Sequence, residues 1–348
     1  MKVVLAQINP TVGDLSSNSS KIIKVIQQYS SKCDLIIFPE MCLTGYPPQD
    51  LLLDTSFINK TAKTLDTIGI SVQETPVILG TIRKERDNLY NTAAVLHNSR
   101  IIAFRDKTHM PTYDVFDEDR YFISADIRKP IELNIQGKPI ILGIEICEDL
   151  WDNDYEIKVS QELIHAGADI LINISASPFH LNRLNERLDI IRDKLKDLKC
   201  YFIYCNLVGA QDELVFDGQS CVVNPAGELV YLSPAFKEIT HIIDLDNCEH
   251  ISQPESSEEE QIFHALSLGV QDYFKKTGHN KAVLGLSGGI DSALTAVIAS
   301  DALGPANVLG ISMPSIYSSD HSIEDAKSLA ENLGIDFKII SIKKINEQ

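Results

Sequence analysis

An apolar run of strand length, Pro139 to Ile146, most constrains how this chain folds, because a strand so rich in Ile and Leu has to be buried. It leads directly into Cys147, Glu148 and Asp149. At the end of a buried strand the chain turns and backbone N–H groups lose their ladder partners, so a thiol there is well placed to attack a carbonyl. Those freed amides can stabilise the developing oxyanion. The alternative is a buried structural cysteine, which is the more common role of any single cysteine.

Along roughly the first 250 residues, predicted strands alternate with predicted helices and hairpins, which indicates a layered α/β domain. Ser20 is predicted to cap the first helix. The predicted strands are Val3–Gln7, Leu35–Phe38, Val77–Thr81, Thr92–Leu96, Arg100–Arg105, Asp169–Ile174 and Tyr201–Leu207. The predicted helices are Lys21–Gln28, Ile157–Ala166 and Leu184–Leu198.

The composition changes at residues 247–260, where proline, serine and glutamate leave little to bury. We therefore divide the chain into a first domain at 1–246, an acidic linker at 247–260 and a second domain at 261–348. Beyond the first domain we predict helices over Glu258–Lys276, Ser292–Leu303 and Ser322–Asn332, and strands over Ala282–Leu286, Val308–Ser312 and Phe337–Ser341. This alternation predicts a parallel sheet with right-handed connections.

With 31 basic and 49 acidic residues, the chain has a net charge of −18 and should repel a nucleic-acid backbone and an anionic membrane surface. No apolar run approaches the ~20 residues that cross a bilayer, and the N-terminus lacks the apolar core of a secretion signal. Seven cysteines without a C-x-x-C pair are typical of a reducing compartment. We expect a cytoplasmic protein that binds neither nucleic acid nor membranes.

Three residues of complementary chemistry follow three separate predicted strands: Glu40, Lys107 and Cys147. A cysteine amidase needs a base for the thiol proton, a cation or N–H donor for the tetrahedral oxyanion and a route to protonate the leaving amine. A partly desolvated glutamate can be the base, and a lysine can stabilise the oxyanion. The nine histidines form no H-x-x-x-H pattern and none adjoins Cys147, so the sequence indicates neither a zinc site nor a Cys-His pair.

The contexts FPEMCLTGYPP, RDKTHMPTYDVFDE and ICEDLW resemble the nitrilase superfamily, whose members use a Glu-Lys-Cys triad in an α-β-β-α sandwich. The resemblance covers roughly residues 1 to 245. It implies that Glu40 is the general base, Lys107 stabilises the tetrahedral intermediate and Cys147 forms a thioester. Glu118 matches a second active-site glutamate of the superfamily. The alternative for Glu118 is a surface ion pair with Arg120.

The same resemblance places Tyr113, Glu148 and Ser175 where glutamine-hydrolysing members contact the amino-acid head of the substrate. A zwitterionic ligand needs a carboxylate for its ammonium group, and Glu148 is the natural candidate. The aromatic side chains that could wall the pocket, with core packing as the commoner role of such residues, are Trp151, Phe116 and Phe179.

The stretch Ser287 to Ser292, SGGIDS, follows a predicted strand and opens a predicted helix, the context in which a glycine-rich turn binds phosphate. Gly288 and Gly289 let the backbone approach a ligand closely, and the two serines add hydroxyl donors. Asp291 would repel phosphates unless a divalent cation lies between them, so we expect Mg²⁺ at Asp291. A plain strand-to-helix turn is the alternative.

The string S-G-G-x-D-S resembles the pyrophosphate loop of the ATP pyrophosphatases, which implies ATP binding by Ser287, Gly288, Gly289, Asp291 and Ser292. Met313 would lie at the end of the next strand, where adenine could pack. Ser322 followed by Asp325 has the spacing of a helix cap, which is a structural use of that serine.

The two halves together resemble the glutamine-dependent NAD⁺ synthetases. The resemblance implies that ammonia from glutamine reaches a second site along an enclosed path, where ATP adenylates nicotinic acid adenine dinucleotide and ammonia displaces AMP to give NAD⁺. It implies ATP and Mg²⁺ for the synthetase half, no cofactor for the glutaminase half, small-molecule substrates and a homo-oligomer. The synthetase domain of that family extends beyond the third predicted strand, so we expect this 348-residue chain to hydrolyse glutamine but not to complete NAD⁺ synthesis.

Two other functions stay open at this stage. One is a stand-alone nitrilase-type amidase that acts on another ω-amide. The other is a non-catalytic module that keeps the fold. Neither explains why S-G-G-I-D-S follows the first domain.

Overall fold

The computed structural model describes residues 1–196 and 198–343, and it divides them into two compact units. The first comprises Met1–Gln211 and Phe216–Glu255, and the second comprises Asp212–Val215 and the described residues from Ser256 onward. The predicted helix Leu184–Leu198 includes residue 197, and the predicted second domain includes residues 344–348, which lie outside the described residues.

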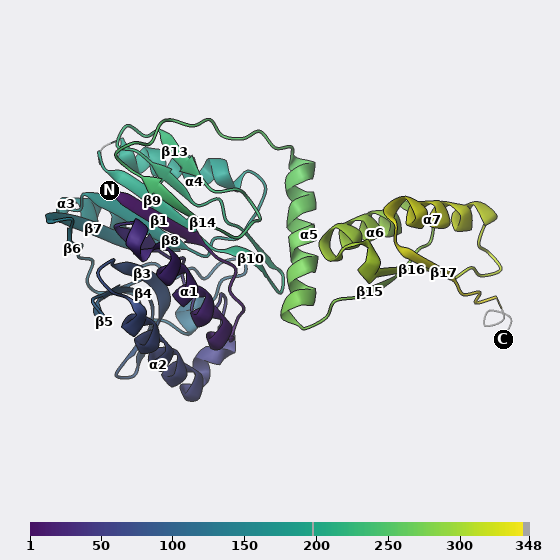
Figure 1. Ribbon diagram of the computed structural model, residues 1–348, viewed down its shortest axis with the longest axis horizontal. Helices are drawn as coiled ribbons and strands as arrows, with labels where there is room; N and C mark the ends of the chain where they lie inside the picture. Colours follow the sequence, from purple (N-terminus) through teal and green to yellow (C-terminus); the bar gives the residue numbers. More distant parts are fainter. Residues whose placement is uncertain (197, 344–348) are drawn as a thin grey trace. The chain divides into compact units, whose positions relative to one another are not determined.

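Two six-stranded sheets form the first unit (Figure 1). The first sheet has the order β14 (Ile239–Asp244), β1 (Lys2–Gln7), β2 (Leu35–Ile37), β3 (Val77–Glu85), β4 (Asn88–His97), β5 (Arg100–Asp106). The second has the order β13 (Leu229–Leu232), β12 (Cys221–Val223), β9 (Tyr201–Asn206), β8 (Ile170–Ser175), β7 (Lys138–Ile146), β6 (Ile131–Ile135). The neighbours β1, β2 and β3 are parallel, as are β7, β8 and β9, and the other pairs in both sheets are antiparallel. A separate two-stranded sheet pairs β10 (Val208–Gln211) with β11 (Leu214–Asp217).

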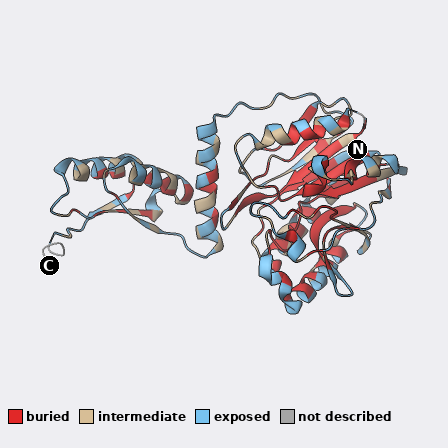
Figure 2. Cartoon of the chain, turned by 180° about the vertical axis from the view of Figure 1, so that it is seen from behind, coloured by how far each residue is buried: buried red, intermediate tan, exposed pale blue. Residues whose placement is uncertain are grey.

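The main core lies between the two sheets, because inward-facing Val, Leu and Ile side chains of both contribute to one buried cluster. Full burial of each such side chain stabilises the fold by about 1.5–3 kcal/mol relative to exposure. Helices α1 (Leu15–Tyr29) and α2 (Thr55–Ser71) lie against the first sheet, and α3 (Val159–His165) and α4 (Arg183–Leu195) pack on the second (Figure 1). Figure 2 shows the buried residues concentrated in the sheets. The predicted α-β-β-α sandwich is confirmed.

The predicted start of the first helix was wrong. Helix α1 begins at Leu15 and is capped by Asp14, whose carboxylate accepts from the backbone N–H of Ser17 over 3.0 Å. Ser20 lies inside the helix, and its hydroxyl donates to the carbonyl of Ser16. The run of serines resembled a turn, but Leu15, Ile22 and Ile26 supply the buried face that holds the segment helical. No element was predicted over α2 or β6.

The second unit contains a three-stranded parallel sheet in the order β15, β16, β17. Its elements are α5 (Glu258–Lys276), β15 (Ala282–Gly285), α6 (Ile290–Leu303), β16 (Val308–Ser312), α7 (Asp320–Leu333) and β17 (Asp336–Ile339). The predicted alternation of strands and helices is confirmed, and the predicted ends agree to within two residues. A small apolar cluster from β15, β16, α6 and α7 covers one face of this sheet.

The cap of α7 differs from the prediction. Ser319 is the N-cap, because its hydroxyl accepts from the backbone N–H of Ser322 over 3.3 Å. Ser322 therefore lies in the first turn of the helix and does not start it. The opposite face of the sheet carries Val283, Leu309 and Ile311, of which Val283 is exposed.

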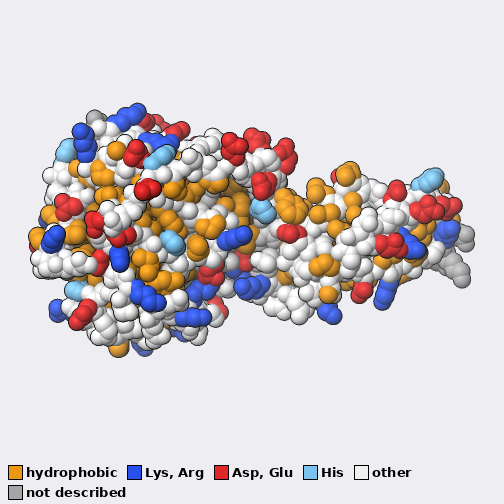
Figure 3. Space-filling view, turned by 45° about the horizontal axis from the view of Figure 1, so that its top comes forward, with side chains coloured by type: hydrophobic (Ala, Val, Ile, Leu, Met, Phe, Trp, Pro, Cys, Tyr) orange, Lys and Arg blue, Asp and Glu red, His pale blue; other side chains and the backbone are white. Residues whose placement is uncertain are grey.

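On the surface drawn in Figure 3, basic, acidic and apolar side chains are interspersed over both units. Among the described residues, no helix combines the length and the apolar character that a membrane crossing needs.

Candidate active site

The ends of three strands deliver the predicted catalytic residues. Glu40 follows β2 by three residues, Lys107 comes directly after β5, and Cys147 comes directly after β7. The side chains of Glu40 and Lys107 are completely buried. Since β2 and β5 belong to one sheet and β7 to the other, the candidate site combines residues of both halves of the sandwich.

A buried ion cluster joins Glu40, Lys107 and Glu118. The Nζ atom of Lys107 donates to Glu40 Oε1 over 2.9 Å and to the two carboxylate oxygens of Glu118 over 2.9 and 2.8 Å. Burial alone would lower the pKa of Lys107, but the charges of Glu118 and Glu40 raise it well above its usual value. The lysine is therefore an ammonium group held between two carboxylates. The alternative of a surface pair between Glu118 and Arg120 was wrong, since Arg120 donates to Asp50.

Cys147 sits at a backbone position that is unusual for its residue type. Its φ of +43° lies in the left-handed region, which residues other than glycine rarely adopt. It is the first residue of the short 3₁₀ turn η4 (Cys147–Leu150), and it is 7% exposed. Burial and then the charge of Glu40 raise the pKa of its thiol, against the opposing effect of Lys107. The resting sulfur is therefore a thiol, and it needs a base to become a nucleophile.

Further hydrogen bonds fix the two carboxylates. Glu40 Oε2 accepts from the backbone N–H of Ala176 over 2.7 Å, and Glu40 Oε1 accepts from Asn91 Nδ2 over 2.7 Å. The hydroxyl of Tyr46 donates to Glu118 Oε1 over 2.8 Å. With every oxygen engaged, each carboxylate has a single orientation toward Lys107.

Asp149 ties the segment around Lys107 to the segment around Cys147. Its Oδ1 atom accepts from the backbone N–H groups of Thr108 and His109, and its Oδ2 atom accepts from that of Ile146. The residue is buried, and burial raises its pKa to about 7 in spite of the donors. One carboxylate thus connects the ends of β5 and β7.

Glu148 lies where a cationic ligand group could be bound. Its carboxylate accepts from the hydroxyl of Tyr113 over 2.9 Å and from that of Tyr155 over 3.1 Å. Burial raises the pKa of Glu148, and Tyr113 is the leading group among those that oppose the shift. The pKa of Tyr155 is raised to about 12 by burial and by Glu148. Tyr113 is half exposed, so this pair is open to solvent on the tyrosine side.

Of the three predicted ligand residues, Tyr113, Glu148 and Ser175, only Ser175 is completely buried. Its hydroxyl donates to Asn173 Oδ1 over 2.6 Å. Ser177, two residues further along, contacts Arg183, whose Nε atom donates to the Ser177 hydroxyl over 3.3 Å. The charge of Arg183 acts on both Tyr113 and Glu148. Arg183 is therefore a cation that acts on Glu148 and that the sequence analysis did not identify.

Of the three aromatic residues expected to wall the pocket, Phe116 lines the pocket beside Glu118, and Trp151 packs against the core. Trp151 packs against the core between the second sheet and its helices, and Arg183 stacks on its ring at 4.2 Å from the centroid. Phe116 meets the ring of Tyr113 edge-on at 5.6 Å. Phe179 meets Phe236 in the same way at 5.2 Å.

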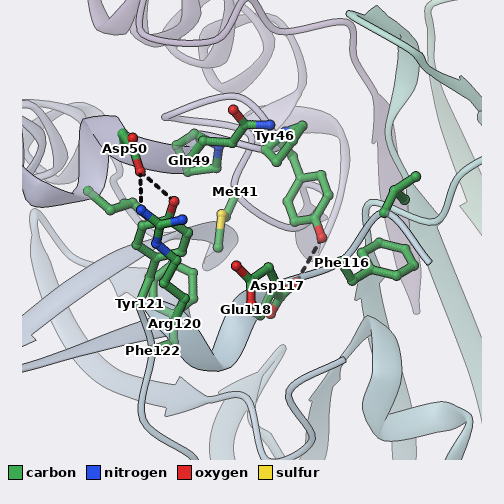
Figure 4. Close-up of a pocket in the computed structure, with 14 residues that line it drawn as sticks. Met41, Tyr46, Gln49, Asp50, Phe116, Asp117, Glu118, Arg120, Tyr121 and Phe122 are labelled. Atoms are coloured by element: carbon green, nitrogen blue, oxygen red, sulfur yellow. Dashed lines mark hydrogen bonds and ion pairs between the residues drawn. The ribbon is translucent and has the colours of Figure 1, made fainter. Parts of the chain in front are cut away.

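A pocket of about 300 Å³ reaches the ion cluster from the side of Glu118 (Figure 4). Two loops line it, one around residues 41–52 and one around residues 115–122. In Figure 4, Tyr46 extends from the first loop toward Glu118, and Met41 lies between them and the rim. Asp50 accepts from Arg120 and Tyr121 at the rim, which joins the two loops.

The glycine-rich loop of the second unit connects β15 to α6. Gly288 has a φ of +81°, and a Cβ atom there would lie 2.4 Å from the carbonyl oxygen of Ser322, so only glycine fits. Gly289 caps the helix. The hydroxyls of Ser287 and Ser292 lie 3.0 Å apart, and the latter also accepts from the backbone N–H of Ser287.

Asp291 and Met313 flank this loop. Asp291 is exposed in the first turn of α6. Met313 follows β16, is half exposed, and would lie 3.3 Å from a Cβ atom built on Gly285. The described residues contain no cluster of three or more His, Cys, Asp or Glu side chains that could hold a metal by themselves. A cation at Asp291 would therefore need other oxygen ligands, such as phosphates.

The sequence did contain signals for some residues that the reasoning missed. Asn91 is a polar residue at a buried position of an apolar strand, and such a residue needs a hydrogen-bond partner. Tyr46 lies within the same glycine- and proline-rich motif as Glu40. Arg183 had no comparable signal, because only the folded chain brings α4 to Glu148.

The sequence matches two family models. Residues 2–253 match the family described as carbon-nitrogen hydrolase, and residues 262–348 match the one described as NAD synthase.

Curated proteins of one name align along nearly the whole chain. The sequence is 39% identical to the glutamine-dependent NAD(+) synthetase of Aquifex aeolicus and 41% identical to that of Synechocystis sp.. Each alignment covers 99% of this chain, against 66% and 65% of the relative. The chain thus spans just under two thirds of the length of these relatives.

Solved structures agree with the observed architecture. The glutamine-dependent NAD⁺ synthetase of Acinetobacter baumannii, solved with ADP, superposes with a TM-score of 0.92 at 34% identity over 99% of this chain and 65% of that one. An amidase from Nesterenkonia sp. superposes with a TM-score of 0.60 over 70% of this chain and 90% of that one. At 19% identity, the second likeness concerns the fold alone.

Proposed function

The chain belongs to the carbon-nitrogen hydrolase family, and on that premise we propose that its first domain hydrolyses the side-chain amide of glutamine to glutamate and ammonia. The observation that carries the proposal is the buried cluster of Glu40, Lys107 and Glu118, whose charges act on the Cys147 thiol. A base, a cation and a nucleophile are the groups that amide hydrolysis by a cysteine needs.

The reaction proceeds in two stages. Glu40 takes the proton of the Cys147 thiol as the sulfur attacks the amide carbon, and Lys107 stabilises the negative oxygen of the tetrahedral intermediate. The intermediate collapses when the proton passes to the amide nitrogen, so the C–N bond breaks and ammonia leaves a glutamyl thioester on Cys147. Water, deprotonated by Glu40, then attacks the thioester and releases glutamate and the thiol. Glu118 holds Lys107 in place throughout.

Recognition of glutamine requires one group for each charge of its amino-acid head. We assign Glu148 to the ammonium group, supported by Tyr113, and Arg183 to the carboxylate. Ser175, a buried hydroxyl on β8 whose own hydrogen bond goes to Asn173, would line this region.

For the second unit we propose the first part of a synthetase domain, with residues 1–246 as the glutaminase domain and 261–348 as this part. Ser287, Gly288, Gly289 and Ser292 would cradle the phosphates of ATP at the N-terminus of α6, and Met313 would pack against the adenine. Mg²⁺ would bind Asp291 together with phosphate oxygens, and it would neutralise charge as pyrophosphate leaves.

The relatives' name describes glutamine-dependent formation of NAD⁺, and we propose that this chain contributes the glutamine-hydrolysing step of such a reaction. Ammonia from glutamine would convert nicotinic acid adenine dinucleotide to NAD⁺, with ATP cleaved to AMP and pyrophosphate. We further propose that the protein works in the cytoplasm as a homo-oligomer.

Glutamate release tests the first step. The purified chain is offered glutamine, asparagine and simple ω-amides, and the products are quantified alongside the Cys147→Ala variant. We expect glutamate from glutamine, little product from the other amides, and none from the variant. A preference for another amide would favour a stand-alone amidase, and equal behaviour of the variant would leave a non-catalytic module.

A further inference from the structure

One neutral side chain donates to both carboxylates of the ion cluster. Asn91 lies in β4 and is completely buried. Its Nδ2 atom is 2.7 Å from Glu40 Oε1 and 3.4 Å from Glu118 Oε2, and its backbone carbonyl accepts from the backbone N–H of Lys107 over 2.9 Å. The side-chain amide therefore bridges the two carboxylates, and the backbone carbonyl of the same residue holds the backbone of the lysine that lies between them.

The orientation of the Asn91 amide carries information about the carboxylates. An NH₂ group can only donate, and an ionised carboxylate presents acceptors on both oxygens, whereas protonation turns one of its oxygens into a donor. Within the described residues, the opposite end of the amide, Asn91 Oδ1, has no hydrogen-bond partner. A buried polar atom without a partner costs about 1–3 kcal/mol. The cost of the unpartnered oxygen is offset by the two hydrogen bonds that the NH₂ group donates to Glu40 and Glu118.

The charges of the cluster explain why such a donor is needed. The carboxylates of Glu40 and Glu118 both bind the ammonium group of Lys107 in a buried site. Repulsion between two neighbouring negative charges favours uptake of a proton by one of them. The pKa of Glu118 is raised by burial, against the effect of Lys107. The other titratable groups facing the pair are Tyr46, which donates to Glu118, and the Cys147 thiol, which Glu148 faces in turn. Only neutral donors can stabilise both negative charges without adding a positive one.

We propose that Asn91 is a positioning residue that keeps Glu40 and Glu118 ionised together, so that Glu40 stays available to take the proton of the Cys147 thiol. The inference deepens the proposed amide hydrolysis and rests on it for the role of Glu40. It assigns to a neutral strand residue the task of setting the pH at which the nucleophile becomes active.

The test follows the reactivity of Cys147 with iodoacetamide from about pH 5 to about pH 9, read by mass spectrometry of the peptide that contains it. The Asn91→Ala variant lacks the donor, so the pair takes up its proton at a higher pH. We expect the acidic limb of the rate profile to move up by about one pH unit, which is a tenfold loss of rate on that limb. The Asn91→Thr variant keeps a hydroxyl donor and should lie between the two; it replaces Asn91→Ala if the latter does not fold.

Asn18→Ala is the matched control. Asn18 is also buried, but its side chain bonds only to the backbone of Thr11 and Leu43. Its removal should lower stability and leave the pH profile in place. A profile of Asn91→Ala that coincides with the wild type, or that moves to lower pH, would overturn the inference.

Glutamate release, measured separately, distinguishes failure of this inference from failure of the proposed function. If the wild type releases no glutamate while the limb still moves in Asn91→Ala, the glutaminase proposal fails and the role of Asn91 stands. If the wild type releases glutamate and the limb does not move, the role of Asn91 fails alone.

Discussion

Asp149 accepts a hydrogen bond from the backbone N–H of Thr108 over 2.9 Å, so the turn that begins at Cys147 is joined to the residue that follows Lys107. The second carboxylate oxygen of Asp149 accepts from Ile146, the last residue of β7. The distance between nucleophile and cation therefore depends on a side chain that needs no contact with the substrate.

Replacement of Asp149 by asparagine should loosen this connection. Asparagine has one acceptor oxygen, so if that oxygen faces Thr108 and His109, its NH₂ group faces the N–H of Ile146. We expect the free energy of unfolding in urea to fall by about 1–3 kcal/mol, because a buried N–H loses its partner. We also expect slower acylation of Cys147 by glutamine with little change in KM.

Asp169→Asn provides the comparison for this change. Asp169 also accepts from a backbone N–H of β7, that of Ile141, but it is exposed at the other end of the strand. Its replacement should cost a few tenths of a kcal/mol, as is usual for surface sites. Equal effects of the two substitutions on acylation would contradict the role of Asp149.

Glu118→Gln should nearly abolish glutamate release while the chain stays folded. The carboxylate of Glu118 meets Lys107 with both oxygens, and an amide would offer one oxygen and one N–H that repels the ammonium group. The lysine would then turn toward Glu40 and occupy the base. We expect kcat to fall by about two orders of magnitude or more, the size found when an electrostatic group of an active site is lost. Glu162→Gln, which removes the partner of Arg128 at the surface, should leave kcat unchanged; a comparable loss there would refute a specific role for Glu118.

The stability of the first unit should depend on pH through Glu145. This residue is buried on β7, and its carboxylate accepts from Ser160 over 2.7 Å and from Asn173 over 3.1 Å. Burial raises its pKa, against the charge of Lys194 and these two donors. A carboxyl whose pKa is higher in the folded than in the unfolded chain contributes stability at low pH, and the contribution is lost as the pH rises through the folded pKa.

The stability of Glu145→Gln relative to the wild type should therefore increase as the pH rises. The free energies of unfolding of both proteins are measured in urea at about pH 5 and about pH 8, and the difference is compared between the two conditions. Exposed Glu132, on β6, serves as the reference for the same substitution and should show no comparable trend. If the difference in free energy of unfolding between the two proteins is the same at both pH values, or if Glu145→Gln becomes relatively less stable at high pH, the raised pKa of Glu145 is contradicted.

Gly288→Ala should disrupt the loop between β15 and α6. Alanine would have to adopt a positive φ there, and its Cβ atom would meet the backbone of Ser322. Gly278 also has a positive φ, of +78°, but nothing lies within 4 Å of a Cβ atom built on it. We expect Gly278→Ala to cost about 1 kcal/mol and Gly288→Ala clearly more, with faster hydrogen exchange at residues 287–292. Similar losses in both would mean that the contact with Ser322 does not constrain the loop.

The sequence was most informative where one local signal acted alone. Helix α5 was predicted from Glu258 to Lys276 with both of its ends correct, and its acidic start is typical of a helix N-terminus. Strand β16 was predicted with both of its ends correct. Glu40, Lys107 and Cys147 were found because each follows a predicted strand and because their contexts resemble the nitrilase superfamily.

What the sequence could not supply depends on contacts between distant segments. Only the family resemblance indicated Glu118 as an active-site residue, because its contact with Lys107 arises from the chain folding back after β5 and no local pattern separates it from a surface pair with Arg120. Asp149 faces three backbone N–H groups of two segments that lie about 40 residues apart, a separation that no periodicity encodes. Helix α1 was misplaced because serines favour both turns and helix starts, and only burial of Leu15 decides between them.

The central claim is that Cys147 is the nucleophile of a glutaminase, and it is tested most directly by trapping its acyl intermediate. The chain is mixed with glutamine, quenched in acid within the first turnover and digested for mass spectrometry. We predict that the peptide containing Cys147 gains the mass of one glutamyl group, and that this adduct disappears in Cys147→Ser and accumulates more slowly in Glu118→Gln. Glutamate release without any adduct at Cys147, or an adduct on another cysteine, would contradict the account.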